Sequence, residues 1–104
     1  MDKIRVFLAE DEFVVRQGIK KNIDWEGHGY EFCGEAADGE LAFPMIQKLR
    51  PEIVITDIRM PFMDGLELSR LIKKELPHTE IIILTGHEEF EYAKESFTHI
   101  QLPN

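Results

Sequence analysis

The sequence predicts an α/β fold built around a parallel β-sheet, and three observations support this prediction. First, segments rich in strand-forming residues alternate with segments whose apolar residues recur at helical spacing. Second, residues 53–55 and 81–84 are continuous aliphatic runs, as expected for parallel strands that are covered on both faces. Third, 104 residues suit one domain, 1–104, because single cores usually serve roughly 50 to 200 residues.

The first half of the chain contains two strand and helix units. Residues 4–9 predict the first strand, and apolar residues at helical spacing over 15–23 predict the helix that follows. Residues 31–36 predict the second strand, and an apolar stripe over 42–49 predicts the second helix. We expect Pro44 to lie near the first turn of that helix, where proline is tolerated.

The second half repeats this plan and then ends abruptly. A third strand is predicted at 53–57, and a third amphipathic helix over 68–76. A fourth strand is predicted at 81–85 and a fourth helix over 88–96. Only a short segment, 97–104, remains for any further element.

The composition excludes several classes of function. The formal net charge of -8 opposes binding to the phosphate backbone of nucleic acid, so any control of DNA requires another domain. The apolar runs are far shorter than the roughly 20 residues of a membrane-spanning helix, and we expect a cytoplasmic protein with no membrane contact. Cys33 is the only cysteine, which excludes an internal disulfide.

Polar side chains occur where three of the predicted strands end. They are the acidic run Glu10-Asp11-Glu12, then Asp57, and then Thr85. In a doubly wound sheet, ligands bind beyond the carboxyl ends of the strands, so these residues are the candidate site. Crowded carboxylates repel one another unless a cation joins them, and hard oxygen ligands favour Mg²⁺. Taken alone, each acidic group is equally consistent with a solvated turn or a helix start.

Together these motifs resemble the receiver domains of bacterial two-component response regulators. The resemblance rests on the acidic pair after the first strand, the segment 57–65 with its Met-Pro and Asp-Gly elements, and Thr85-Gly86 after the fourth strand. It covers about residues 3–95, and residues 79–95 are further similar to receivers of AraC-type response regulators.

The resemblance implies a flavodoxin-like doubly wound sheet with strand order 2-1-3-4-5. It implies that Asp57 accepts a phosphoryl group from a sensor histidine kinase, and that Thr85 contacts this group and switches a partner-binding face. The implied Mg²⁺ ligands are Glu10, Asp11, Asp57 and the backbone carbonyl of Arg59. On this view the domain catalyses only its own phosphorylation and dephosphorylation, and an AraC-type DNA-binding output domain outside this chain controls transcription.

The last residues depart from the family pattern. Receivers usually continue into a fifth strand ending in Lys-Pro and then a fifth helix, whereas aligning 98–103 with that strand puts Leu102 at the lysine position and His99 at the switch aromatic position. No residues remain for a fifth helix. We therefore expect slower phosphotransfer, and pairing with another chain through an exposed sheet edge or the fourth helix.

Three other functions compete with this interpretation. The missing lysine suggests a receiver-like module that binds partners without taking phosphate. An aspartate-nucleophile phosphohydrolase usually places a second Asp two residues after the first, where this chain has Arg59. A flavodoxin-like cofactor binder needs a phosphate-cradling first loop, and the acidic run 10–12 repels phosphate in the absence of a metal.

Overall fold

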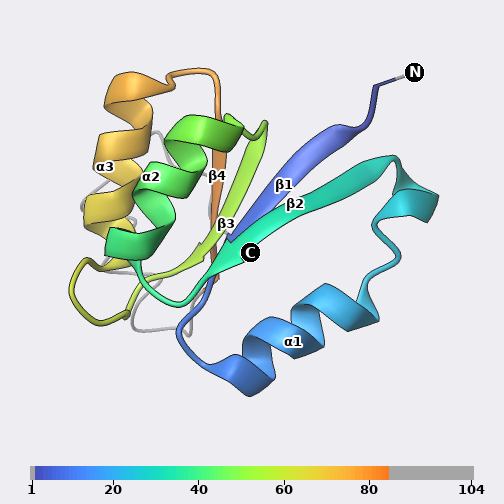
Figure 1. Cartoon of the computed structure of the whole chain (residues 1–104), viewed down its shortest axis with the longest axis horizontal. Helices are drawn as coiled ribbons and strands as arrows, with labels where there is room; N and C mark the ends of the chain where they lie inside the picture. The colour runs from blue at the N-terminus through green and yellow to red at the C-terminus, as the bar shows by residue number, and fades with distance from the viewer. Residues whose placement is uncertain (1, 85–104) are drawn as a thin grey trace.

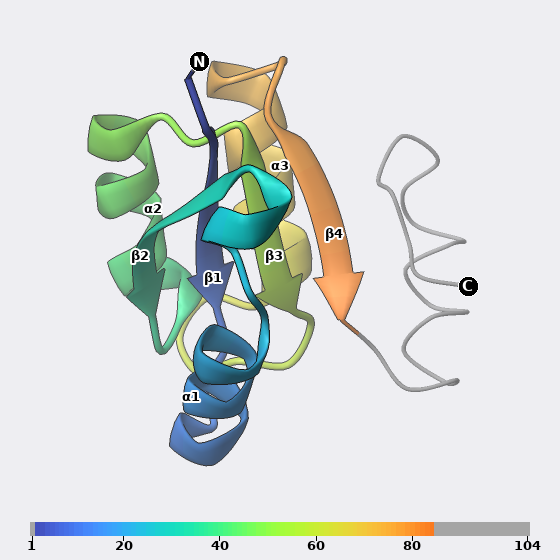
Figure 2. The same cartoon turned by 90° about the vertical axis from the view of Figure 1, so that its right-hand side faces the viewer.

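The computed structural model describes residues 2–84 of the chain. Four strands pair in parallel in the order β2-β1-β3-β4, which confirms the predicted sheet through its fourth strand (Figure 2). The strands are β1 (Ile4–Ala9), β2 (Tyr30–Ala36), β3 (Ile53–Asp57) and β4 (Glu80–Leu84). The predicted helix over 88–96 and the predictions about a fifth strand and a fifth helix lie outside the described residues.

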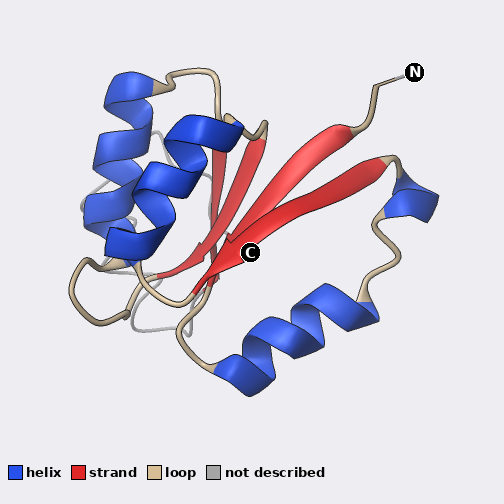
Figure 3. Cartoon of the chain, in the orientation of Figure 1, coloured by secondary structure: helices blue, strands red, loops and turns tan. Residues whose placement is uncertain are grey.

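Helices lie on both faces of this sheet. They are α1 (Phe13–Asn22), α2 (Gly39–Leu49) and α3 (Gly65–Glu75), and a short 3₁₀ helix, η1 (Glu26–His28), precedes β2. Helices α2 and α3 pack side by side on one face, and α1 lies on the opposite side (Figures 1 and 3). None of the helices among the described residues is both long and apolar enough to span a bilayer.

The main core lies between the sheet and the α2–α3 pair. Phe7, Val54 and Ile81 point to this face from neighbouring strands, and Ile46 and Ile72 meet them from the two helices. All five side chains are fully buried, and burying a side chain of this size contributes roughly 1.5–3 kcal/mol. In β3 and β4 the alternate residues on this face are fully buried, whereas the aliphatic residues between them, on the other face, are only partly buried.

An Asp-Gly pair starts each of the two packed helices. The side chains of Asp38 and Asp64 each accept a hydrogen bond from a backbone amide three residues later, at 2.8 Å. These are N-cap bonds, which satisfy amides that have no partner inside the helix. Because α2 already begins at Gly39, Pro44 lies inside the helix, and its predicted place near the first turn was wrong.

Helix α1 differs from α2 and α3 because none of its residues is buried. Its apolar side chains include Phe13 and Val14, which are 66% and 81% exposed. After the helix, Trp25 packs against the rings of Tyr30 and Phe32, with centroids 6.4 and 5.4 Å away. Apolar burial along α1 is therefore limited to partly buried side chains such as Ile19.

Candidate functional site

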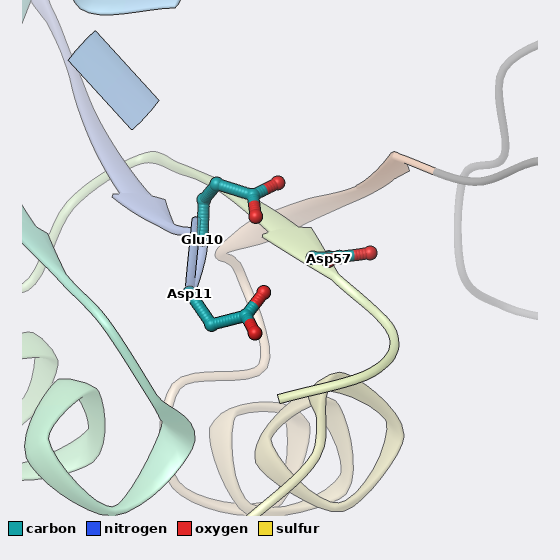
Figure 4. Close-up of side chains that lie close together, drawn as sticks. All are labelled: Glu10, Asp11 and Asp57. Atoms are coloured by element: carbon teal, nitrogen blue, oxygen red, sulfur yellow. The ribbon is translucent and has the colours of Figure 1, made fainter. Parts of the chain in front are cut away.

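The carboxyl ends of β1 and β3 bring three acidic side chains together. Ala9 of β1 pairs with Thr56 of β3, so the residues that follow them are neighbours. Glu10, Asp11 and Asp57 each offer a carboxylate oxygen, and these oxygens all lie within 4.8 Å of one another. Figure 4 shows the three side chains pointing into the same space. The structure thus brings together the three carboxylates that the sequence predicted as metal ligands.

Glu10 is the buried member of this cluster, at 4% exposure. Its backbone amide donates to the carbonyl of Ala36 in β2, and its Oε2 accepts from the amide of Glu12, each at 3.0 Å. Burial raises the pKa of Glu10, and together with the negative charges of Asp57 and Asp11, and against the lowering effect of the Glu12 amide, it brings this pKa to about 7. The cluster therefore favours either a proton or a cation at this position.

This raised pKa predicts how the stability of the metal-free protein depends on pH. The folded state holds a proton on Glu10 up to about pH 7, whereas the unfolded chain loses it near 4.5. The free energy of unfolding should therefore fall as pH rises between these values. In EDTA at pH 8, Glu10→Gln should be more stable than the native chain by about 3 kcal/mol, with little difference at pH 4.5.

Urea unfolding at the two pH values measures this difference. Glu12→Gln is the matched control, because it also removes one negative charge from the same turn, and the side chain of Glu12 is exposed. Equal gains for Glu10→Gln and Glu12→Gln at pH 8 would mean that only the net charge matters.

The backbone around Asp57 is held by neighbouring groups. Its Oδ1 accepts from the amide of Ile58 and its carbonyl accepts from the hydroxyl of Thr56, each at 2.8 Å. The amide of Gly65 donates to the carbonyl of Ile58 at 2.7 Å. An ideal Cβ on Gly65 would lie 1.9 Å from the carbonyl oxygen of Asp57, so the start of α3 packs directly against this residue.

The donor set suits Mg²⁺, which prefers oxygen ligands and is commonly held by one or two carboxylates. The side chain of Glu12, the third residue of the acidic run, is exposed to solvent. The carbonyl of Arg59 as a ligand stays a prediction, and Thr85 lies outside the described residues. The sequence did not point to Thr56, because a threonine is ordinary in a strand, nor to Arg16, whose side chain donates to the carbonyl of Glu10.

The parallel sheet, with carboxylates at the ends of its first and third strands, agrees with the resemblance to receiver domains. The chain matches the response regulator receiver domain family over residues 6–99. It therefore belongs to this family, whose members are signalling modules that take a phosphoryl group in two-component systems and bind Mg²⁺ in an acidic pocket.

Relatives and solved structures agree with this assignment. The chain is 41% identical over 95 residues to the uncharacterized transcriptional regulatory protein YesN of Bacillus subtilis, covering 91% of this chain and 26% of YesN. It is 38% identical over 95 residues to the transcriptional regulatory protein HptR of Staphylococcus aureus, covering 91% of this chain and 37% of HptR. The chain thus spans only 26% of the length of YesN and 37% of that of HptR.

Two solved structures share the fold closely. The receiver domain of AraT, a response regulator from Geobacillus stearothermophilus, superimposes with a TM-score of 0.87 at 36% identity, covering 94% of this chain and 77% of that one. A two-component transcriptional regulator AraC from Clostridium phytofermentans gives a TM-score of 0.83 at 32% identity, covering 96% and 77%. Both support the resemblance to AraC-type receivers.

Proposed function

We propose that Asp57 is the phosphoacceptor of this receiver domain, and that Glu10, Asp11 and Asp57, with the carbonyl of Arg59, hold Mg²⁺. The observation that carries the proposal is the approach of three carboxylate oxygens, from the ends of two neighbouring strands, to within 4.8 Å. The phosphodonor is a phosphohistidine on a sensor histidine kinase, since receiver domains act with such kinases.

In the reaction, the carboxylate of Asp57 attacks phosphorus while the bond from phosphorus to the imidazole nitrogen breaks. The imidazole leaves with the electron pair, and an acyl phosphate forms on Asp57. The amide of Ile58 donates to one carboxylate oxygen of Asp57 and so orients the side chain. Bound Mg²⁺ would neutralise charge on the transferred group. The domain catalyses only this transfer and the later hydrolysis of the acyl phosphate, in which water takes the phosphoryl group and the carboxylate of Asp57 is restored.

The output of this step involves parts of the protein beyond the described residues. Thr85 contacts the attached phosphoryl group and changes the face that partners meet. An AraC-type DNA-binding domain in a longer polypeptide then controls transcription in the cytoplasm. The transcriptional regulatory proteins YesN and HptR extend well beyond the matched region, which supports an output that acts on transcription.

The proposed function is tested by incubating the chain with acetyl phosphate and recording its intact mass. With Mg²⁺ the mass should increase by one phosphoryl group, and hydroxylamine should remove it, as expected for an acyl phosphate. EDTA should prevent the increase. No addition under any condition would favour the alternative of a phosphate-independent interaction module, for which the departure of residues 97–104 from the family pattern is the motivating observation.

A further inference from the structure

Helix α1 is attached to the sheet largely by charged and polar side chains. Arg16 is the central one, because its side chain is only 13% exposed although the helix buries no residue fully. Its guanidinium lies 5.5 Å from the ring centroid of Phe13, which partly covers it. A cation shielded in this way interacts more strongly with its partners than one in open solvent.

The guanidinium of Arg16 joins the metal site to the neighbouring strand. Its Nη1 donates to the backbone carbonyl of Glu10 at 2.7 Å, and its Nε donates to Oε1 of Glu35 at 3.0 Å. Glu35 belongs to β2. Through Arg16, helix α1 is therefore bonded both to β2 and to Glu10, whose carboxylate is the buried one of the cluster. The planar fork of arginine donors suits such a two-sided contact.

Glu35 is itself firmly held. Its other oxygen, Oε2, pairs with Lys20 at 2.7 Å, and Gln17 donates to Oε1 at 2.8 Å. The hydrogen bond from Lys20 lowers the pKa of Glu35, with further lowering from Arg16 against the effect of burial. Glu35 therefore stays charged at neutral pH and keeps Arg16 in place.

As a result, both peptide groups that flank Glu10 are tied to the end of β2. The amide of Glu10 donates directly to the carbonyl of Ala36, and the carbonyl of Glu10 is reached through Arg16 and Glu35. These bonds fix the direction in which the Glu10 side chain leaves the backbone. That direction brings its carboxylate to those of Asp11 and Asp57 (Figure 4).

We propose that Arg16, held by Glu35, is a positioning residue for the Mg²⁺ site, because it fixes the backbone of Glu10. This inference rests on the proposed function of the acidic cluster. Groups that orient metal ligands from outside the coordination sphere typically change metal affinity by 10- to 100-fold when they are removed. Arg16 would act in this way on Glu10.

Electrostatics alone predicts the opposite effect of Arg16 on the affinity for Mg²⁺. Arg16 is a cation close to a cation-binding site, so its charge by itself repels Mg²⁺. Replacing it with a neutral residue should then tighten Mg²⁺ binding. If Arg16 positions Glu10, the same replacement should weaken binding instead.

The test is a calorimetric titration of the full chain with Mg²⁺, for the native sequence and for Arg16→Met and Lys20→Met. Lys20 is the matched control, because it pairs with the same Glu35 but no contact joins it to Glu10 among the hydrogen bonds and ion pairs of the described residues. We expect Arg16→Met to weaken binding by roughly 10-fold or more, and Lys20→Met to leave it unchanged or slightly tighter.

Amide exchange at Glu10 gives a second measurement, made without metal. The Glu10 amide should exchange faster in Arg16→Met than in the native chain or in Lys20→Met, since the hydrogen bond to Ala36 loses its support. If Arg16→Met does not fold, Arg16→Lys replaces it. A lysine keeps the positive charge but lacks the planar pair of donors that reaches both Glu10 and Glu35. Weaker Mg²⁺ binding by Arg16→Lys is therefore the expected result.

The outcomes of these measurements distinguish a failure of the positioning role of Arg16 from a failure of the proposed function. Unchanged or tighter Mg²⁺ binding by folded Arg16→Met, or by Arg16→Lys where the first variant is unfolded, overturns the positioning role and leaves the proposed function intact. Equal weakening by Arg16→Met and Lys20→Met overturns it too, because the effect would follow from loosening α1. A native chain that binds no Mg²⁺ overturns the proposed function, and the positioning role with it.

Discussion

Asp57→Asn is expected to abolish phosphoryl uptake from acetyl phosphate in the presence of Mg²⁺. Asparagine has the shape of aspartate, and its side-chain oxygen can still accept from the amide of Ile58, so the loop should keep its course. The amide is not a nucleophile toward phosphorus under these conditions, and one of the three carboxylates proposed to hold Mg²⁺ is lost. Intact mass should therefore show no added phosphoryl group on the folded variant.

Asp64→Asn is the matched control for this experiment, since it changes an aspartate of the same 57–65 segment. Asp64 caps α3 through the amide of Glu67, and asparagine caps helices about as well as aspartate does. The control should take up one phosphoryl group, as the native chain does. Uptake by Asp57→Asn that matches the control would place the acceptor elsewhere and contradict the assignment of Asp57.

The metal-free stability of Asp57→Asn separates a chemical effect from damage to the fold. The charge of Asp57 is one of the causes that raise the pKa of Glu10, so its removal relieves a repulsion in the cluster. In EDTA at pH 8 the variant should be at least as stable as the native chain. A large loss of stability would instead mean that Asp57 is chiefly a structural residue.

The acidic cluster was predictable because it follows from topology. Strands β1 and β3 were recognisable from their apolar runs, and the carboxyl ends of adjacent parallel strands meet at one edge. The structure confirms this for Glu10, Asp11 and Asp57. An Asp-Gly pair such as 38–39 indicates a turn in a sequence, and in the structure it is the start of α2, since the same residues serve turns and N-caps.

The attachment of α1 was not predictable from the sequence. Spacing of Val15, Ile19 and Ile23 indicates a helix but does not say how close the helix lies to the sheet, and none of its residues is buried. Arg16 and Glu35 are ordinary charged residues, 19 positions apart, with nothing in the sequence to pair them. Their pairing depends on where α1 crosses the end of β2, which only the structure gives.

Gly65→Ala is expected to have the largest effect on stability. The added Cβ would lie 1.9 Å from the carbonyl oxygen of Asp57 and 3.0 Å from the hydroxyl of Thr56. The first contact is with backbone that belongs to β3, so no side-chain movement relieves it, and the start of α3 must shift. We expect a loss of roughly 4 kcal/mol or more in the free energy of unfolding, seen as a fall in Tm of roughly 15 °C or more.

Gly18→Ala is the matched control, because the same methyl group there meets only a side-chain atom of Asn22, at 3.9 Å. Gly18 lies within α1, where alanine favours the helix by about 1 kcal/mol. The two substitutions should therefore shift Tm in opposite directions. A Gly65→Ala protein as stable as the native chain would show that α3 can move away from Asp57 at little cost. In that case phosphoryl uptake by the variant would report how much of Asp57's reactivity depends on its contact with α3, since the carboxylate would remain while its backbone support had moved.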